Sequence, residues 1–171
     1  MEKRELNGLE ELPFNRMSLL SMEANMGYIE DLRKIVGHEP LILVGVAVGV
    51  INEQGEILLQ KRSDGRWGVP GGFMELGEST EQAGRREVRE ETGLEIGSLV
   101  LAGVFSGKQH YVKLPNGDEF YPVTIAYVTR DICGGQLKAD GIESTEAQFF
   151  AVTELPDDLS PLVKSLILKF A

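Results

Sequence analysis

Residues 72–94, GFMELGESTEQAGRREVREETGL, are the stretch of this 171-residue chain that decides its fold. Ser79, followed three residues later by Gln82, is the pattern of a helix N-cap with its capping-box partner. Gly93 is typical of the residue just past a helix C-terminus. The stretch therefore predicts one helix over residues 80–92.

Three carboxylates share one side of that predicted helix. Glu87, Glu90 and Glu91 are spaced i, i+3 and i, i+4, so they are close neighbours on a helix surface. Like charges at this spacing destabilise an isolated helix by about 0.2 to 0.5 kcal/mol per pair. A cation must offset the repulsion, and Arg86 can reach Glu90 one turn on. A solvated face of ion pairs is one interpretation, and a Mg²⁺ ion with oxygen ligands is the other.

The spacing of the stretch decides between these interpretations. It resembles, at every fixed position, the signature of the Nudix hydrolase family, G-x5-E-x7-R-E-U-x-E-E-x-G-U with U a bulky aliphatic residue. With each residue type at roughly 5 to 7 % background usage, a chance match has a probability below about 10⁻⁶. The resemblance implies the Nudix fold, an α/β domain in which a mixed β-sheet is sandwiched between α-helices. The flanking pattern extends it to roughly residues 40–155.

The resemblance also implies roles for the residues of the motif. Glu87, Glu90 and Glu91 would hold one or more Mg²⁺ or Mn²⁺ ions that bridge two phosphates of the substrate, with Glu87 and Glu90 also in catalytic roles. Arg86 would orient these carboxylates by ion pairing, and Glu78 would be an outer ligand or a brace.

Family members often take a further carboxylate, sometimes the general base, from a loop before the last strand. This chain offers Asp140, Glu143 and Glu146 in that region. We expect Glu143 to be the catalytic one, with Glu146 and Asp140 as the open alternatives.

The resemblance implies a metal-dependent pyrophosphohydrolase that cleaves the diphosphate bond of a nucleoside diphosphate linked to another group. Gly71 and Gly72 are expected to line the loop that cradles the diphosphate, and Arg62 to contact a phosphate. Tyr111 resembles a marker of dinucleoside-polyphosphate hydrolases, whereas the proline typical of ADP-ribose-cleaving members is replaced by His110. A nucleoside triphosphate, a dinucleoside polyphosphate and a nucleotide sugar all stay open as substrates. A non-catalytic nucleotide-binding sensor with the same fold is the alternative function.

The composition of the chain limits its expected binding partners and its expected location in the cell. The net charge is −10, the pI is near 4.7, and lysines and arginines are scattered, so a nucleic acid polymer is not expected. The single cysteine, Cys133, cannot form an internal disulfide, and no secretory leader is evident, so we expect a cytoplasmic protein. The longest apolar run, residues 41–51, is too short for a membrane span. A homodimer is left open.

The chain is expected to form one domain over residues 25–171, preceded by an N-terminal extension, residues 1–24, to which no role is assigned. Periodicity and turn residues predict the flanking elements. They are a helix at 28–36, a hairpin of strands 41–51 and 56–61, strands at 99–106, 120–130 and 148–152, and a closing helix at 162–170.

Overall fold

A computed structural model describes residues 27–62, 65–141, 144–160, 162–164 and 166 of the chain. The helices and strands are α1 (Tyr28–Val36), β1 (Leu41–Val50), β2 (Ile57–Arg62), β3 (Trp67–Gly68), α2 (Thr80–Thr92), β4 (Leu94–Ile96), β5 (Val100–Phe105), the 3₁₀ helix Lys108–His110, β6 (Val112–Lys113), β7 (Glu119–Thr129), β8 (Ile132–Gly135) and β9 (Ser144–Phe150). Residues 162–164 and 166 are also helical. The remainder of the predicted closing helix lies outside the described residues, as does the whole N-terminal extension, residues 1–24. No helix in the described ranges is long and apolar enough to cross a bilayer.

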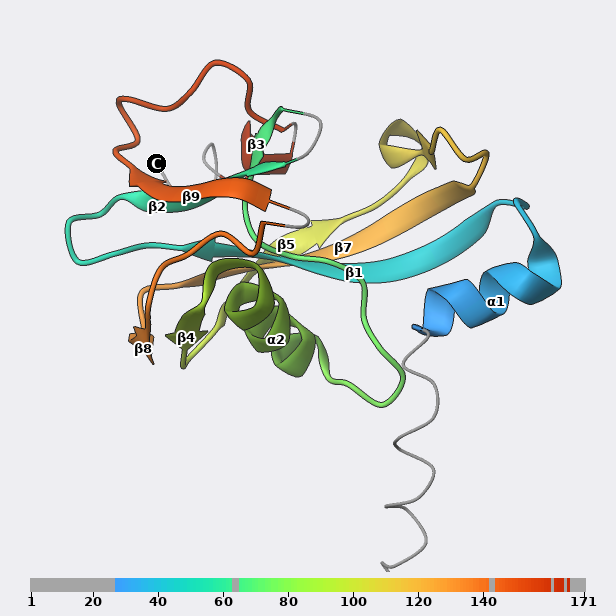
Figure 1. The fold of residues 1–171 in the computed structure, drawn as a ribbon, viewed down its shortest axis with the longest axis horizontal. Coiled ribbons are helices and arrows are strands. Elements are labelled where there is room, and N and C mark those ends of the chain that lie inside the picture. Colours follow the sequence, from blue (N-terminus) through green and yellow to red (C-terminus); the bar gives the residue numbers. More distant parts are fainter. Residues whose placement is uncertain (1–26, 63–64, 142–143, 161, 165, 167–171) are drawn as a thin grey trace, which may run out of the picture.

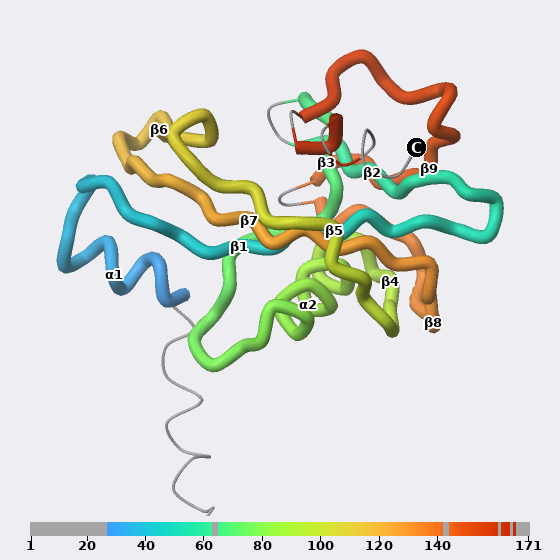
Figure 2. The backbone as a smooth tube through the Cα atoms, turned by 180° about the vertical axis from the view of Figure 1, so that it is seen from behind, coloured from blue at the N-terminus to red at the C-terminus, as the bar shows by residue number. Residues whose placement is uncertain are grey.

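The strands form a mixed layer. β1 pairs in parallel with β7, and β7 pairs antiparallel with β5 and β6. A second group has the order β3-β2-β9 and is antiparallel throughout, and β4 pairs with β8. Figure 1 shows β1, β5 and β7 lying between α2 and the β2–β9 pair, and Figure 2 shows the same arrangement from behind. The predicted α/β class with a mixed sheet is confirmed.

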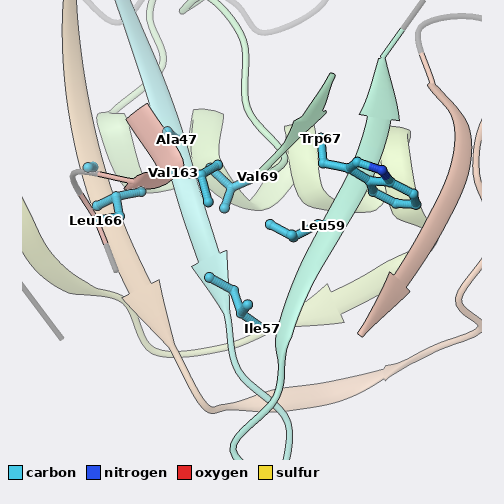
Figure 3. Close-up of a cluster of buried hydrophobic side chains, with 8 residues drawn as sticks. Ala47, Ile57, Leu59, Trp67, Val69, Val163 and Leu166 are labelled. Carbon is cyan, nitrogen blue, oxygen red and sulfur yellow. The ribbon is translucent and has the colours of Figure 1, made fainter. Parts of the chain in front are cut away.

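Two buried clusters explain why helices cover both faces of the strands. Alternate residues of a strand point to opposite faces, and Ala47 of β1 belongs to one cluster while Val48 belongs to the other. Val88 brings α2 onto one face. On the other face, Val163 and Leu166 pack with Ala47 and the β2 side chains, as Figure 3 shows. The strands are therefore sandwiched between helical segments, as predicted.

The predicted hairpin of strands 41–51 and 56–61 is wrong in its pairing. The turn between the two strands forms, with the Gly55 backbone N–H donating to the Asn52 carbonyl at 3.0 Å. Beyond it, Ile51 and Ile57 share an isolated bridge, and then the two strands diverge. β1 pairs with β7, and β2 pairs with β9. Each strand pairs along its whole length with a strand that is distant in the sequence, which a local apolar pattern does not reveal.

The predicted last strand, residues 148–152, is displaced from the observed β9, Ser144–Phe150. Its pairing with β2 already begins at Ser144, opposite Arg62. Backbone hydrogen bonds make this pairing, so a polar sequence can take part in it. The apolar residues that suggested a strand, Phe149 and Phe150, occupy only its end. The short strands β3, β4, β6 and β8 were not predicted, because two to four residues carry no measurable periodicity.

Helix α1 is tied to the sheet by a polar contact. It has the predicted bounds, and none of its residues is buried. The Arg33 guanidinium donates through Nη1 to the carbonyls of Gly37 and Glu39, at 3.0 and 2.7 Å. Through Nη2 it donates to the carbonyl of Glu119 at 2.8 Å. Because Glu119 begins β7, these bonds join α1 to the start of the sheet.

Arg33→Met should therefore lower the melting temperature, because Met keeps the length of the side chain but leaves three carbonyls without this donor. We expect a loss of about 1 to 3 kcal/mol in the free energy of unfolding, measured by chemical denaturation. Ile35→Met is the matched control, since Ile35 lies on the same helix and is 83 % exposed. Equal stabilities of the two variants would show that Arg33 does not anchor α1.

Candidate active site

Helix α2 fixes the relative positions of the carboxylates of the motif. The Gln82 backbone N–H donates to the Ser79 hydroxyl at 3.2 Å, and the Ser79 N–H donates to the Gln82 side chain at 2.8 Å. This is the predicted capping box. At the other end Gly93 has φ +71°, the left-handed conformation predicted for the C-cap. The helix is thereby fixed at both ends.

Arg86 is surrounded by acceptors that use all five of its N–H donors. It donates to the two carboxylate oxygens of Glu78 at 2.7 and 2.9 Å, and to the carbonyl of Phe73 at 3.1 Å. Its Nη1 donates to Glu87 at 2.8 Å and to Glu90 at 3.1 Å. These contacts raise the pKa of Arg86, chiefly through Glu78, and hold the pKa of the Glu78 carboxyl below its usual range. The bonds to Glu87 and Glu90 are compatible with the predicted role of Arg86, which is to orient these carboxylates.

Glu91 is the most buried carboxylate of the motif, at 4 % exposure. Its Oε2 accepts from the Gly71 backbone N–H and from Gln60 Nε2, each at 2.8 Å. Burial raises the pKa of the Glu91 carboxyl to about 7, although these hydrogen bonds and the charge of Arg62 act in the opposite direction. Among the described residues, no ion pair includes Glu91. When Glu91 is ionised, no cation among the described residues forms an ion pair with it, which is costly unless an ion completes the site.

Gln60 is a residue that the sequence interpretation missed. It lies in the middle of β2, is 1 % exposed, and its Oε1 has no hydrogen-bond partner among the described residues. The available signal was an amide directly after two core-forming leucines, in ILLQKR. Its contact with Glu91 spans 31 positions in the sequence.

Two glycines let the preceding loop approach these carboxylates. The segment 70–74 runs beside β1, with Val46 N–H donating to the Gly72 carbonyl at 2.8 Å. A Cβ on Gly72 would stand 2.5 Å from Glu87 Oε1. Gly71 has φ +152°, and a Cβ there would overlap the carbonyl of Val46. Only glycine fits at position 71, because a Cβ there would overlap the β1 backbone, whereas at position 72 a Cβ would press on the end of the Glu87 side chain.

A cavity of about 910 Å³ opens beside this loop. Several predicted site residues line it: Arg62, Gly71, Gly72, Arg86, Glu87 and Glu90. Tyr111 is not among the lining residues of this cavity. Its ring instead contacts Tyr121, with centroids 5.2 Å apart, and its pKa is raised chiefly by a hydrogen bond with Glu119.

Two of the three downstream carboxylates hold local structure. Asp140 accepts from the backbone N–H and the hydroxyl of Ser144, at 2.9 and 3.0 Å, at the start of β9. Glu146 forms an ion pair of 3.0 Å with Lys61 on β2. Glu143 lies outside the described residues.

The carboxylates of α2 do not converge on one point in this arrangement. Glu87 and Glu90 turn toward Arg86, whereas Glu91 turns toward Gly71. Among the described residues, no three acidic, histidine or cysteine side chains are grouped as a metal site. The expected convergence is therefore incomplete, because Arg86 supplies the neutralising charge.

The donor set nevertheless fits a hard divalent ion. Glu87, Glu90 and Glu91 offer only oxygen ligands, and Mg²⁺ accepts one or two carboxylates together with waters and phosphates. The missing Cβ of Gly72 leaves the Glu87 oxygens uncovered by a side chain at that point. The buried charge of Glu91 would also gain a counter-ion.

Comparisons with known proteins agree with this geometry. A family model described as the NUDIX domain matches residues 42–170. An ADP-ribose pyrophosphatase of Methanocaldococcus jannaschii is 39 % identical over 112 residues, which cover 63 % of this chain and 62 % of that protein. An NAD-capped RNA hydrolase of Vibrio atlanticus is 35 % identical over 122 residues, 70 % of this chain and 41 % of that protein. The matches thus span less than two thirds of these relatives. A MutT NUDIX hydrolase structure from Burkholderia pseudomallei has a TM-score of 0.65 at 25 % identity, covering 77 % of this chain and 99 % of that one.

Gly72→Ala should impair the site more than the fold, because the added methyl group would press on the Glu87 carboxylate. We expect Mg²⁺ affinity, measured by titration calorimetry, to fall at least tenfold. Gly134→Ala is the control, since its Cβ would meet only the tip of Glu95 at 3.4 Å. Equal Mg²⁺ affinities in the two variants would contradict the close approach of residue 72 to a ligand.

Millimolar Mg²⁺ should raise the melting temperature of the wild-type protein, because an ion that binds only the folded state stabilises it by mass action. At one hundred times the dissociation constant the gain is about 2.7 kcal/mol. Glu91→Gln removes the buried charge, so this variant should respond less to Mg²⁺ in the same thermal melts. A wild-type melting temperature that is independent of Mg²⁺ would mean that the acidic cluster binds no ion.

Proposed function

The chain belongs to the Nudix family, and on that premise we propose that it is a metal-dependent pyrophosphohydrolase acting on a nucleoside diphosphate linked to another group. The observation that carries the proposal is the buried Glu91 carboxylate, which lies beside Glu87 and against the Gly71 backbone. Burying an unpaired charge costs stability, and a fold retains such a group when it has a use.

The bound ion would be held by Glu87, Glu90 and Glu91, with Mg²⁺ or Mn²⁺ as the expected metal. When bound, it would neutralise the phosphate oxygens and lower the pKa of a bound water. Arg86 keeps two of these carboxylates in place through its bonds to Glu87 and Glu90.

The loop before α2 would position the diphosphate. Gly71 and Gly72 bring backbone to the edge of the cavity, and the Arg62 side chain also lines it. A guanidinium at this place suits a phosphate oxygen. Tyr111 does not line this cavity, so it would contact only a substrate that extends beyond the cavity.

The assisting base is assigned to Glu143. The two alternative carboxylates already have partners: Asp140 accepts a hydrogen bond from Ser144, and Glu146 forms an ion pair with Lys61. This supports Glu143 over both of them. Moving Asp140 would cost its bonds to Ser144 at the start of β9, and moving Glu146 would cost its ion pair with Lys61 on β2.

The two sequence relatives are named for ADP-ribose and for NAD-capped RNA, which both contain a diphosphate joined to sugars on its two sides. The shared group supports a substrate with a nucleoside diphosphate linkage. The alternative, a non-catalytic sensor, is less well supported, because every carboxylate of the motif is present. Release of nucleoside monophosphate from a panel of nucleoside diphosphate derivatives, with and without Mg²⁺, tests the proposal. Full turnover in excess chelator would refute metal dependence.

Glu91→Gln should lower kcat by two or more orders of magnitude, about 2.7 kcal/mol or more of transition-state stabilisation, because it removes one charge beside the metal. Glu81→Gln is the matched control: Glu81 lies in the first turn of the same helix and is exposed. It should stay within about threefold of wild type. Equal kcat values at saturating Mg²⁺ would overturn α2 as the catalytic helix.

A further inference from the structure

The cavity beside the catalytic carboxylates is larger than a diphosphate requires. Its volume of about 910 Å³ is near the upper end for small-molecule sites, which run from roughly 300 to 1,000 Å³. Its far side, here called the distal wall, is formed by α1 and by the turn between β6 and β7. The lining residues of the distal wall include Ile29, Glu30, Leu114, Asn116 and Asp118. The cavity therefore has room for a group attached to the diphosphate.

The cations of the distal wall already have partners. Arg33 lines the cavity, but its terminal nitrogens donate to three backbone carbonyls. Lys34 also lines it and forms an ion pair of 2.7 Å with Asp31. A phosphate at the distal wall would have to displace these bonds. Arg62 lines the cavity together with Gly71, and among the described residues its guanidinium makes only a longer bond, from Nη2 to the Val69 carbonyl at 3.4 Å.

The remaining polar groups of the distal wall suit hydroxyl groups. Asp118 Oδ1 is 2.7 Å from His38 Nδ1, and its Oδ2 accepts from Asn116 at 2.9 Å. The bond with His38 holds the pKa of the Asp118 carboxyl below its usual range, so the group is ionised. An ionised carboxylate has about four acceptor sites, so each oxygen can accept a further hydrogen bond. Glu30 adds a second, solvent-exposed carboxylate.

The carboxylates of the distal wall determine which ligand groups can bind there. Glu30 would repel an additional phosphate. Asp118, whose Oδ1 also lies 3.7 Å from Arg33 Nε, would accept hydrogen bonds from a sugar together with Glu30, while Ile29 and Leu114 offer apolar contact. We propose that the distal wall binds a hydroxylated sugar group that carries no further phosphate. The substrate would then be a diphosphate joined to sugars on both sides, rather than a nucleoside triphosphate or a dinucleoside polyphosphate. This inference rests on the proposed function.

The test compares ADP-ribose with ATP as substrates in wild type, Glu30→Gln and Glu30→Lys. Wild type should favour ADP-ribose at least tenfold in kcat/KM. Removing and then reversing the charge should raise kcat/KM for ATP stepwise, by about fivefold in Glu30→Lys, and should lower the value for ADP-ribose, because the sugar loses an acceptor. High salt should reduce the difference, because exposed charges are screened.

Glu53→Lys is the matched control. Glu53 is exposed in the turn that follows β1, and α1 precedes the other end of this ten-residue strand, about 33 Å away. The control makes the same change in net charge far from the distal wall. It should therefore leave the ratio of kcat/KM for ADP-ribose to kcat/KM for ATP unchanged. A wild-type preference for ATP, or a ratio that Glu30→Lys does not alter, would overturn the proposal.

Equilibrium binding separates failure of this inference from failure of the proposed function. If no member of the panel of nucleoside diphosphate derivatives is hydrolysed, the proposed function fails, and calorimetric titration of ADP-ribose and ATP into the same proteins still tests the distal wall. Tighter binding of ADP-ribose to wild type, with ATP binding strengthened in Glu30→Lys, would support it. Absence of ADP-ribose binding would refute it.

Discussion

The five hydrogen bonds of Arg86 are the interaction on which the site depends. They join the Phe73 carbonyl of the preceding loop to Glu78 and to the carboxylates of α2. Without this guanidinium, the acidic residues of one helix face would repel one another and the loop would lose its attachment. A planar group with five donors can satisfy four residues at once, which lysine cannot do.

The second constraint is the buried charge of Glu91. The strand layer and α2 enclose it, with Gln60 on one side and the Gly71 backbone on the other. Burial raises the pKa of this carboxyl, so the metal-free fold bears a cost at neutral pH. The two apolar clusters on either side of the strands offset that cost by burying side chains from β1, β2 and the helices.

Helix α1 connects the fold to the choice of substrate. Arg33 holds it against the start of β7, and the same helix then provides part of the distal wall. The residue that anchors the helix is thereby withdrawn from phosphate binding. The cavity thus differs at its two ends, with Arg62 and the glycine loop at one and Glu30 with Asp118 at the other.

The sequence by itself determined the features that depend on neighbours along the chain. The bounds of α1 and α2, the capping box at Ser79 and the contact of Arg86 with Glu90 all follow from spacings of a few residues, where helix geometry fixes which groups meet. Tertiary structure alone decided the partners of β1 and β2, the contact of Gln60 with Glu91, and the meeting of α1 with the β6–β7 turn. These contacts join residues dozens of positions apart. Local periodicity says which face of an element is buried, but not which distant element covers it.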